Sequence, residues 1–366
     1  MSGFEFIENK KVELITNTSY SNKQNNLRSK LPWIEKYRPK NIDDIVSQEK
    51  VVKSLKISLE SNDLPHLLLF GPPGTGKTST ILAVGRELFG QELMKNRVIE
   101  LNASDDRGIN AVREKIKLYA KNAISDATEY KKRTNNKYPC PPYKIIVLDE
   151  ADSMTKDAQS ALRKIMEDYS HITRFCFICN YINKIIEPIS SRCASYGFLP
   201  LNKKLMAKKI AFIAEKENIK FTDEMIKKIV HISDGDMRKG IMMLQNLKYM
   251  QKFYDNDDET VDKISEMNGY MQEKDIEKIL NGLKNCSFDE NIKVVEDIVE
   301  SGYSVDYFLE QFFNVLITDK DLTDEMKSKI CLHFSDNQKK IIDGADEYLQ
   351  LMDILMYTYM VVLGEF

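Results

Sequence analysis

The sequence predicts an α/β fold with a parallel sheet covered by helices on both faces, followed by a small helical domain and an all-α C-terminal domain. Two observations support this fold class. Continuous apolar runs alternate with helix-like segments between residues 31 and 200, which is typical of a parallel sheet buried on both faces. All ten prolines lie in residues 1–200, so nothing interrupts helices further on. The 366 residues, of which 42% are apolar, exclude a fibrous or wholly disordered protein.

The first part of the chain predicts five strands with helices between them. Residues 1–30, rich in Asn, Ser and Lys, are expected to form a flexible tail. Strands are expected at the apolar runs, because each is bounded by turn residues or helical patterns. These runs are residues 66–70, 97–101, 144–150, 173–180 and 195–201. Helical patterns occupy residues 77–89, 109–122 and 156–168.

The second part predicts helices only. Asn202 and Thr222 are expected to cap two helices, and a third follows the break at Gly235. An acidic linker at 254–262 precedes further helices, including a long last one at about 345–363. We therefore expect an α/β domain at 31–201, a small helical domain at 202–252 and a helical C-terminal domain at 253–366.

Charge is distributed unevenly along the chain. The formal net charge is −3, but residues 1–250 carry 42 Lys+Arg and 30 Asp+Glu (net +12), whereas residues 251–366 carry 11 and 26 (net −15). A basic part of this kind remains compatible with a polyanionic partner such as nucleic acid.

The sequence shows no signal for a membrane or secretory protein. It has neither an apolar run of about 18 residues nor a secretory apolar core near the N-terminus, so a soluble protein made in the cytosol is expected. Six sparse cysteines indicate reduced thiols. Cys176 and Cys179 form a CxxC inside an apolar run; without a second ligand pair, a buried strand is favoured over a zinc or redox site.

The strongest motif is GPPGTGKT at residues 71–78, which fits the phosphate-loop pattern GxxxxGK[ST] between a strand and a helix. Its backbone N–H groups can converge on a β-phosphate, while Lys77 reaches the β- and γ-phosphates and the Thr78 hydroxyl binds Mg²⁺. The ATP-binding loop comprises Gly71, Pro72, Pro73, Gly74, Thr75, Gly76, Lys77, Thr78 and Ser79.

Polar residues follow two later strands. The run at 144–148 leads into Asp149 and Glu150, where Asp149 can hold Mg²⁺ and Glu150 can polarise a water for attack on the γ-phosphate. Asn180 ends the next strand and can contact the γ-phosphate or that water, although an Asn at a strand end is equally common for turn reasons. Together with the phosphate loop, these residues predict ATP hydrolysis.

Six segments resemble one family, the AAA+ clamp-loader small subunits of replication factor C. They are PWIEKYRPK (32–40), GPPGTGKTST (71–80), ELNASDDRGI (100–109), IIVLDEADSMTKDAQSALRKIME (145–167), TRFCFICNYINKIIEPISSRC (173–193) and GDMRKGI (235–241). Among the paralogues, the wording of the fifth segment and the extended loop before residue 144 are most similar to the group called two in yeast and four in vertebrates. The resemblance implies an AAA+ domain, a lid domain and an oligomerising collar.

The resemblance also implies roles for individual residues. Trp33, Tyr37, Arg38 and Pro39 match the stretch that wraps the adenine and ribose, although a hydrophobic strap closing the domain is an alternative. Asn180 matches the residue called sensor one.

Two arginines gain roles through the resemblance alone. Arg192 matches the arginine finger, which reaches the γ-phosphate held by the neighbouring subunit; without the family it would be interpreted as a solvated surface residue. Arg238 matches sensor two, on the lid.

DNA contacts are implied near residues 100–121. Arg107, Arg113 and Lys117 match positions that track phosphates, with a solvated helix face as the alternative for Arg113 and Lys117. The basic, proline-rich segment 131–144 is expected to be an exposed flexible loop, with contact to DNA or the clamp as the alternative.

The expected function is that of an ATPase in a nuclear hetero-pentamer, which opens a sliding clamp and loads it onto primer-template DNA with ATP and Mg²⁺ as cofactors. One rival is an AAA+ helicase or initiator, disfavoured because the acidic C-terminal part lacks a basic recognition helix. The other is a structural ATP-binding subunit with negligible turnover, disfavoured by the intact Lys77, Asp149 and Glu150.

Overall fold

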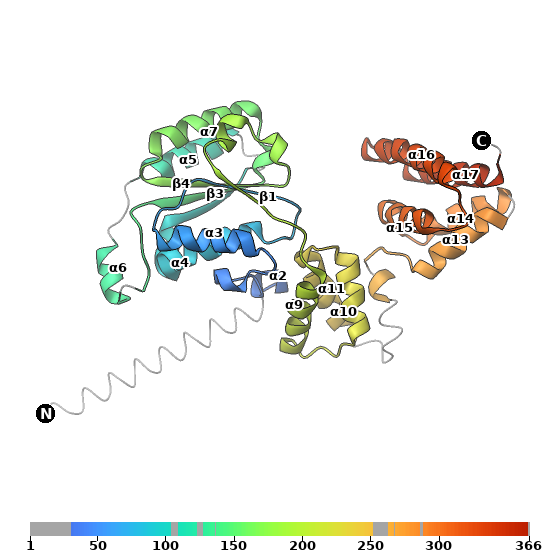
Figure 1. Cartoon of the computed structure of the whole chain (residues 1–366), viewed down its shortest axis with the longest axis horizontal. Helices are drawn as coiled ribbons and strands as arrows, with labels where there is room; N and C mark the ends of the chain where they lie inside the picture. The colour runs from blue at the N-terminus through green and yellow to red at the C-terminus, as the bar shows by residue number, and fades with distance from the viewer. Residues whose placement is uncertain are drawn as a thin grey trace. The chain divides into compact units, whose positions relative to one another are not determined.

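The computed structural model describes residues 31–103, 109–122, 127–135, 137–251, 263–266, 268–285 and 288–364 (Figure 1). The expected tail at 1–30 and the acidic linker at 254–262 lie outside these ranges. The chain divides into two compact units, one up to Gln245 and the other from Asn246 onward. Across the described ranges, no helix is both long and apolar enough to cross a membrane.

A five-stranded sheet forms the centre of the first unit, and all its strand pairs are parallel. Its strands, in sheet order, are β2 (Val98–Asn102), β3 (Lys144–Asp149), β4 (Thr173–Cys179), β1 (Leu67–Phe70) and β5 (Ala194–Gly197). This confirms the predicted α/β class. β5 ends at Gly197, four residues before the end of the predicted run at 201.

The strand side chains alternate between two cores, one on each face of the sheet. Leu67 and Leu69 belong to one core, whereas Leu68 between them belongs to the other. Helices α3 (Glu49–Glu60) and α4 (Lys77–Arg97) contribute to the first core. Helices α5 (Ile109–Lys121) and α7 (Lys156–Tyr169) contribute to the second. Burial on both faces explains why these strands are continuous apolar runs.

Helix α4 extends beyond the predicted end at residue 89 and reaches Arg97. Gly90 interrupts its helical geometry with φ 67° and ψ 175°. A Cβ atom at this position would lie 2.3 Å from the Tyr130 hydroxyl. Gly90 therefore permits both the change of direction and the close approach of a second segment.

That second segment corrects the expectation for residues 131–144. It begins within helix α6 (Thr128–Arg133), and its later part is buried against α4 and the sheet. The Cys140 N–H donates to the Leu88 carbonyl at 2.9 Å, and Tyr143 is only 4% exposed. The expectation of an exposed flexible loop is thus wrong for Cys140, Pro141, Tyr143 and Lys144, which are buried.

Three helices complete the first unit: α9 (Lys203–Lys216), α10 (Asp223–Ser233) and α11 (Met237–Met250). Both predicted caps are present. The Asn202 side chain accepts a bond from the Lys204 N–H at 2.9 Å, and the Thr222 hydroxyl accepts one from the Met225 N–H at 3.3 Å. The division between the two units falls inside α11.

Among the described residues of the second unit, the only regular elements are helices, as predicted. Its helices include α13 (Glu273–Asn285), α14 (Phe288–Glu300), α15 (Val305–Thr318), α16 (Asp324–Ile342) and α17 (Glu347–Leu363). They share one core that includes Phe308 and Phe312, whose rings stack at 5.7 Å. Helix α16 was not predicted, although the Thr323 hydroxyl caps it by accepting from the Met326 N–H.

His66 lies just before β1 and connects the start of this strand to its neighbour β4. Its Nδ1 atom accepts a hydrogen bond from the Phe175 N–H at 3.0 Å. Burial, assisted by the nearby Arg174, lowers the pKa of His66 from 6.5 to about 4. At pH 5 the His66 ring is therefore neutral in the folded protein, whereas it is protonated in the unfolded chain.

We expect this histidine to make the first unit less stable in mild acid. A lowered folded-state pKa contributes stability that is complete above pH 6.5 and is lost as pH falls toward 4. Between pH 7 and pH 5 the loss should be about 1–2 kcal/mol after allowance for partial exposure. Urea unfolding followed by fluorescence of Trp33, the single tryptophan, measures it.

The variant His66→Gln should lose much of this pH dependence, because its side chain does not titrate. His171→Gln, at an exposed position, is the control and should behave like the wild type. An unchanged pH dependence in His66→Gln would show that His66 is not responsible.

Candidate active site

A cavity of about 470 Å³ lies at the carboxyl ends of β1, β3 and β4, within the range of roughly 300–1,000 Å³ typical of ligand pockets. Its walls come from a segment at 34–46, the loop at 73–79, the ends of β2, β3 and β4, and helices α9 and α11. All of these belong to the first compact unit. Ligands bind at this edge of open parallel sheets because loops there leave a crevice.

The phosphate loop connects β1 to α4, which begins at Lys77. Gly76 precedes it in a left-handed conformation with φ 96°. Gly74 is also left-handed, with φ 67°, and its carbonyl accepts a bond from the Met237 N–H of α11 at 3.3 Å. The positive end of α4 therefore faces the cavity, which suits an anionic ligand.

Lys77 is only 7% exposed, and its ammonium group is bonded within the site. It donates to the carbonyls of Gly71 and Pro72 at 2.6 and 2.8 Å. It also donates to the Asn180 Oδ1 atom at 3.0 Å. Burial lowers the pKa of Lys77, partly opposed by Asp149. An anion bound in the cavity would stabilise the charged form of Lys77, which burial destabilises.

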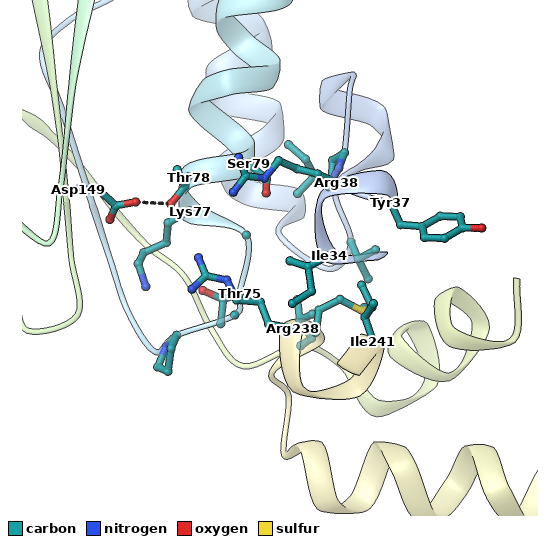
Figure 2. A pocket seen from close by; sticks show the side chains of 18 of the residues that line it. Ile34, Tyr37, Arg38, Thr75, Lys77, Thr78, Ser79, Asp149, Arg238 and Ile241 are labelled. Carbon is teal, nitrogen blue, oxygen red and sulfur yellow. Dashed lines mark hydrogen bonds between the residues drawn. The ribbon is translucent and has the colours of Figure 1, made fainter. Parts of the chain in front are cut away.

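Thr78 and Asp149 form the link between α4 and β3. The Thr78 hydroxyl donates to Asp149 Oδ2 at 2.8 Å (Figure 2). A hydroxyl and a carboxylate are hard oxygen ligands of the type that Mg²⁺ accepts together with water and phosphate oxygens. Within the described ranges, no group of three or more His, Cys, Asp or Glu side chains is arranged to hold a metal. The Thr78–Asp149 pair fits a Mg²⁺ ion whose other ligands are water and phosphate oxygens.

Glu150 lines the same cavity in an unusual backbone conformation. Its φ of 54° lies in the left-handed region, and its N–H donates to Asp149 Oδ1 at 2.9 Å. The Ser153 hydroxyl donates to its carbonyl at 2.7 Å. Non-glycine residues held at positive φ are strained, and such strain concentrates at functional sites.

Asn180 also lines the cavity, and a second acidic residue holds its backbone. Asp152 Oδ2 accepts from the N–H groups of Asn180 and Tyr181 at 3.3 and 3.4 Å. The structure therefore brings Lys77, Asp149, Glu150 and Asn180 together at one edge of the sheet.

Two further walls come from the segment at 33–39 and from α11 (Figure 2). Tyr37, Arg38 and Pro39 line the cavity, whereas Trp33 is buried outside it with its ring edge against Tyr37. Arg238 lines the opposite side, and Figure 2 shows its side chain extending from α11 toward Thr75 and Lys77.

Arg192 does not line the cavity of its own chain. It pairs with Glu167 at 2.7 Å and donates to the Pro188 carbonyl at 2.7 Å. Its side chain is 38% exposed, so the guanidinium is accessible from outside.

The three residues implied in DNA contact are only partly described. Arg107 lies outside the described residues. Arg113 belongs to α5, and Lys117 is exposed on that helix.

The structure adds cavity residues that sequence reasoning missed, among them Glu100, Asn102 and Lys209. Asn102 lies opposite Asp149 in the register of β2 and β3. Burial raises the pKa of Glu100, partly opposed by Arg38. The polar residues at the end of the predicted strand at 97–101 could have indicated these positions. They lie at the cavity only because β2 pairs with β3, and the sequence does not reveal that pairing.

Cys176 and Cys179 are buried in β4, as expected. Burial raises the pKa of Cys179 to about 12 and that of Cys176 well above its ordinary value. Both side chains are therefore protonated thiols, and they pack into different cores, Cys176 on one face of the sheet and Cys179 on the other.

Three family descriptions match successive parts of the chain. Residues 67–201 match "ATPase family associated with various cellular activities (AAA)". Residues 208–248 match "RCF1/5-like, AAA+ ATPase lid domain", and residues 271–357 match "Replication factor C C-terminal domain".

Relatives from plants, fungi and animals are similar over nearly the whole chain. Rice replication factor C subunit 2 is 46% identical, covering 90% of this chain and 94% of its own. Subunit 4 from Homo sapiens is 45% identical, covering 91% and 89%. Subunit 2 from Saccharomyces cerevisiae is 44% identical, covering 89% and 92%. These names agree with the paralogue group predicted from the sequence.

Among solved structures, the Thermotoga maritima RuvB Holliday junction branch migration motor is similar with a TM-score of 0.51. It is 19% identical and covers 75% of this chain and 91% of its own. At this identity the similarity shows the fold, not the activity.

We expect Gly74→Ala to disturb the contact between the phosphate loop and α11. A Cβ atom there would lie 1.7 Å from Asp236 Oδ1, the atom that accepts the Arg238 N–H at 2.7 Å. Displacing Asp236 should move Arg238 and weaken nucleotide binding, which titration with a fluorescent ATP analogue measures.

Gly302→Ala is the matched control for backbone strain. Gly302 has φ 72°, close to that of Gly74, but nothing lies within 4 Å of its Cβ position. Both variants should lose about 1 kcal/mol of stability through left-handed strain, and only Gly74→Ala should lose affinity. Equal affinities in the two variants would contradict the role assigned to this contact.

Proposed function

Because the chain belongs to the replication factor C small subunit family, we propose that it loads sliding clamps onto DNA as an ATP-dependent clamp-loader subunit. It is an AAA ATPase with a lid and a replication factor C C-terminal domain. The observation that carries the proposal is the cavity in which the phosphate loop, the Thr78–Asp149 pair and Arg238 meet.

The cavity residues fit a magnesium-bound ATP. Thr78 and Asp149 would hold Mg²⁺, which when bound neutralises charge on the phosphate oxygens. Lys77 would bind the β- and γ-phosphates, and its low exposure strengthens that attraction. The strap formed by residues 33–39 would enclose the base and ribose through Tyr37, Arg38 and Pro39.

Hydrolysis requires a polarised water and stabilised charge. The Glu150 carboxylate would accept a hydrogen bond from the attacking water and so increase its nucleophilicity. The Asn180 amide, whose backbone is held by Asp152, would orient that water or the γ-phosphate. Arg238 would stabilise phosphate charge from the lid side of the cavity.

Arg192 would act on the neighbouring subunit. It lies outside its own cavity and is partly exposed, which suits a guanidinium that reaches a phosphate across an interface. Each chain would then hydrolyse its own ATP and promote ATP hydrolysis by the neighbouring subunit.

The proposed partners are the other clamp-loader subunits of a hetero-pentamer, the sliding clamp and primer-template DNA, in the nucleus during replication and repair. The net +12 of residues 1–250, against −15 beyond them, supports DNA contact by the ATPase and lid domains. Arg107, Arg113 and Lys117 are proposed to contact DNA phosphates. The C-terminal match at 271–357 favours a loader over the branch-migration activity of the RuvB structure.

We expect Lys77→Ala to abolish nucleotide binding, because it removes the buried positive charge that faces the phosphates. Glu150→Gln should retain binding but lower DNA-stimulated ATP hydrolysis at this site by roughly 10²–10⁴-fold, the usual contribution of a general base. Steady-state ATPase assays and nucleotide titrations on the assembled complex separate the two effects.

The control is Glu296→Gln, a matched substitution at an exposed position of α14. Wild-type turnover in Glu150→Gln would show that another group activates the water. Turnover at this site that is negligible in the wild type would instead support a structural nucleotide.

Arg192→Ala should lower hydrolysis at the adjoining subunit and leave ATP binding at its own site unchanged. Arg163→Ala is the matched control, since both arginines pair with Glu167, at 2.7 and 3.0 Å. The measurement is single-site hydrolysis in complexes in which only the adjoining subunit is active. Equal rates with the two variants would exclude the trans role.

A further inference from the structure

The strap at residues 33–39 and the lid form different walls of the cavity, and a bridge outside the cavity joins them. Tyr37 and Arg38 belong to the strap wall, while Lys209 and Arg238 belong to the lid wall. Figure 2 shows the Tyr37 ring extending away from Thr75 and Lys77, and neither Lys36 nor Glu217 lines the cavity. The Tyr37 hydroxyl contacts Glu217, which immediately follows α9 of the lid.

Two residues of the strap, Lys36 and Tyr37, contact the same carboxylate oxygen of Glu217. The Tyr37 hydroxyl donates to Glu217 Oε1 at 2.6 Å, and the Lys36 ammonium forms an ion pair with the same atom. The Glu217 side chain is 8% exposed, so water screens this interaction little. Burial and Glu217 raise the pKa of Tyr37, which keeps the hydroxyl protonated as a donor. Charge-assisted hydrogen bonds of this kind are the strong ones.

Both ends of the bridge are held firmly. On the lid, the Glu217 N–H donates to the Ile213 carbonyl at 3.0 Å, and the Ile219 N–H donates to the Ala214 carbonyl at 3.0 Å. On the strap, Trp33 is 8% exposed and its carbonyl accepts from the Tyr37 N–H at 2.9 Å. The bridge therefore joins two ordered ends and not two loose side chains.

The position of Glu217, far from the point where the chain enters the lid, allows the bridge to restrain rotation of the lid. The chain enters the lid at Asn202, whose N–H donates to the Ser47 hydroxyl at 3.3 Å. Helix α9 has 14 residues, so Glu217 lies roughly 20 Å along the helix from that entry point. A rotation of the lid about its entry point displaces the far end of α9 most. A bond there restrains such a rotation more than a bond near the entry point.

We propose that Glu217 is a positioning residue that ties the lid to the strap, so that the wall around the base and the wall carrying Arg238 hold one relative position. The inference rests on the proposed function, because it concerns nucleotide binding at the same cavity. Without the tie, the contact between Gly74 and Met237 still joins α11 to the phosphate loop, but the lid can rotate further and Arg238 is held less firmly near Lys77. The affinity for ATP then falls more than that for ADP, which lacks the γ-phosphate.

The test uses the full chain assembled with its partner subunits, titrated with fluorescent ATP and ADP analogues. Glu217→Ala should weaken binding of the ATP analogue by about tenfold, the scale of a lost charge-assisted hydrogen bond, and binding of the ADP analogue less. Glu215→Ala, at an exposed position on the same helix, is the matched control and should change neither. Tyr37→Phe should reproduce part of the loss.

The charge exchange Lys36→Glu with Glu217→Lys separates the tie from packing. It restores opposite charges, so we expect it to recover part of the ATP preference that Glu217→Ala loses. Thermal melting of each complex shows whether the variants fold. Loss of affinity without recovery in the exchange would overturn the proposal, as would analogue affinities in Glu217→Ala within about twofold of those in Glu215→Ala.

Lys77→Ala distinguishes failure of this inference from failure of the proposed function. Wild-type binding in Lys77→Ala would show that the cavity is not the nucleotide site. Abolished binding in Lys77→Ala, with no effect of Glu217→Ala, would leave the nucleotide site in place and exclude only the tie.

Discussion

The parallel register of β1, β3 and β4 is the constraint on which the site depends. Because these strands run side by side in one direction, their carboxyl ends meet at one edge. The phosphate loop, Asp149 and Asn180 follow those ends and so come together, although they are far apart in the sequence. The bond from Thr78 to Asp149 closes this arrangement, since it joins the first turn of α4 to the end of β3.

Burial on both faces makes this register strict. Alternate side chains of β1 enter different cores, so a shift by one residue would exchange the two sets and misplace every polar strand end. The same property made the strands predictable, because a strand buried on both sides must be a continuous apolar run. The phosphate loop was predictable for a related reason: the GxxxxGK[ST] spacing indicates a phosphate-binding loop only where it lies between a strand and a helix.

Other features depend on contacts between distant segments, which local patterns do not reveal. The buried position of Cys140 follows from packing against α4 beside Gly90, whereas its proline-rich surroundings indicated a loop. Helix α16 was not predicted, although Met326, Ile330 and Phe334 recur at four-residue intervals; the next buried position is the polar Asn337, which breaks the apolar pattern. Arg192 and Arg238 were identified by family resemblance alone, and the contact between Tyr37 and Glu217 was not anticipated, because it requires two separate elements to meet.

The ion pair between Arg192 and Glu167 sets a cost on any contact that Arg192 makes with another subunit. To make such a contact, the Arg192 guanidinium must leave Glu167 of its own chain. A phosphate bound to another subunit therefore competes with the Glu167 carboxylate for Arg192. Only the difference between the two attractions contributes to holding the subunits together. If Arg192 contacts the γ-phosphate of an adjoining subunit, as proposed, a moderate difference favours a contact that forms while the triphosphate is intact and separates after cleavage.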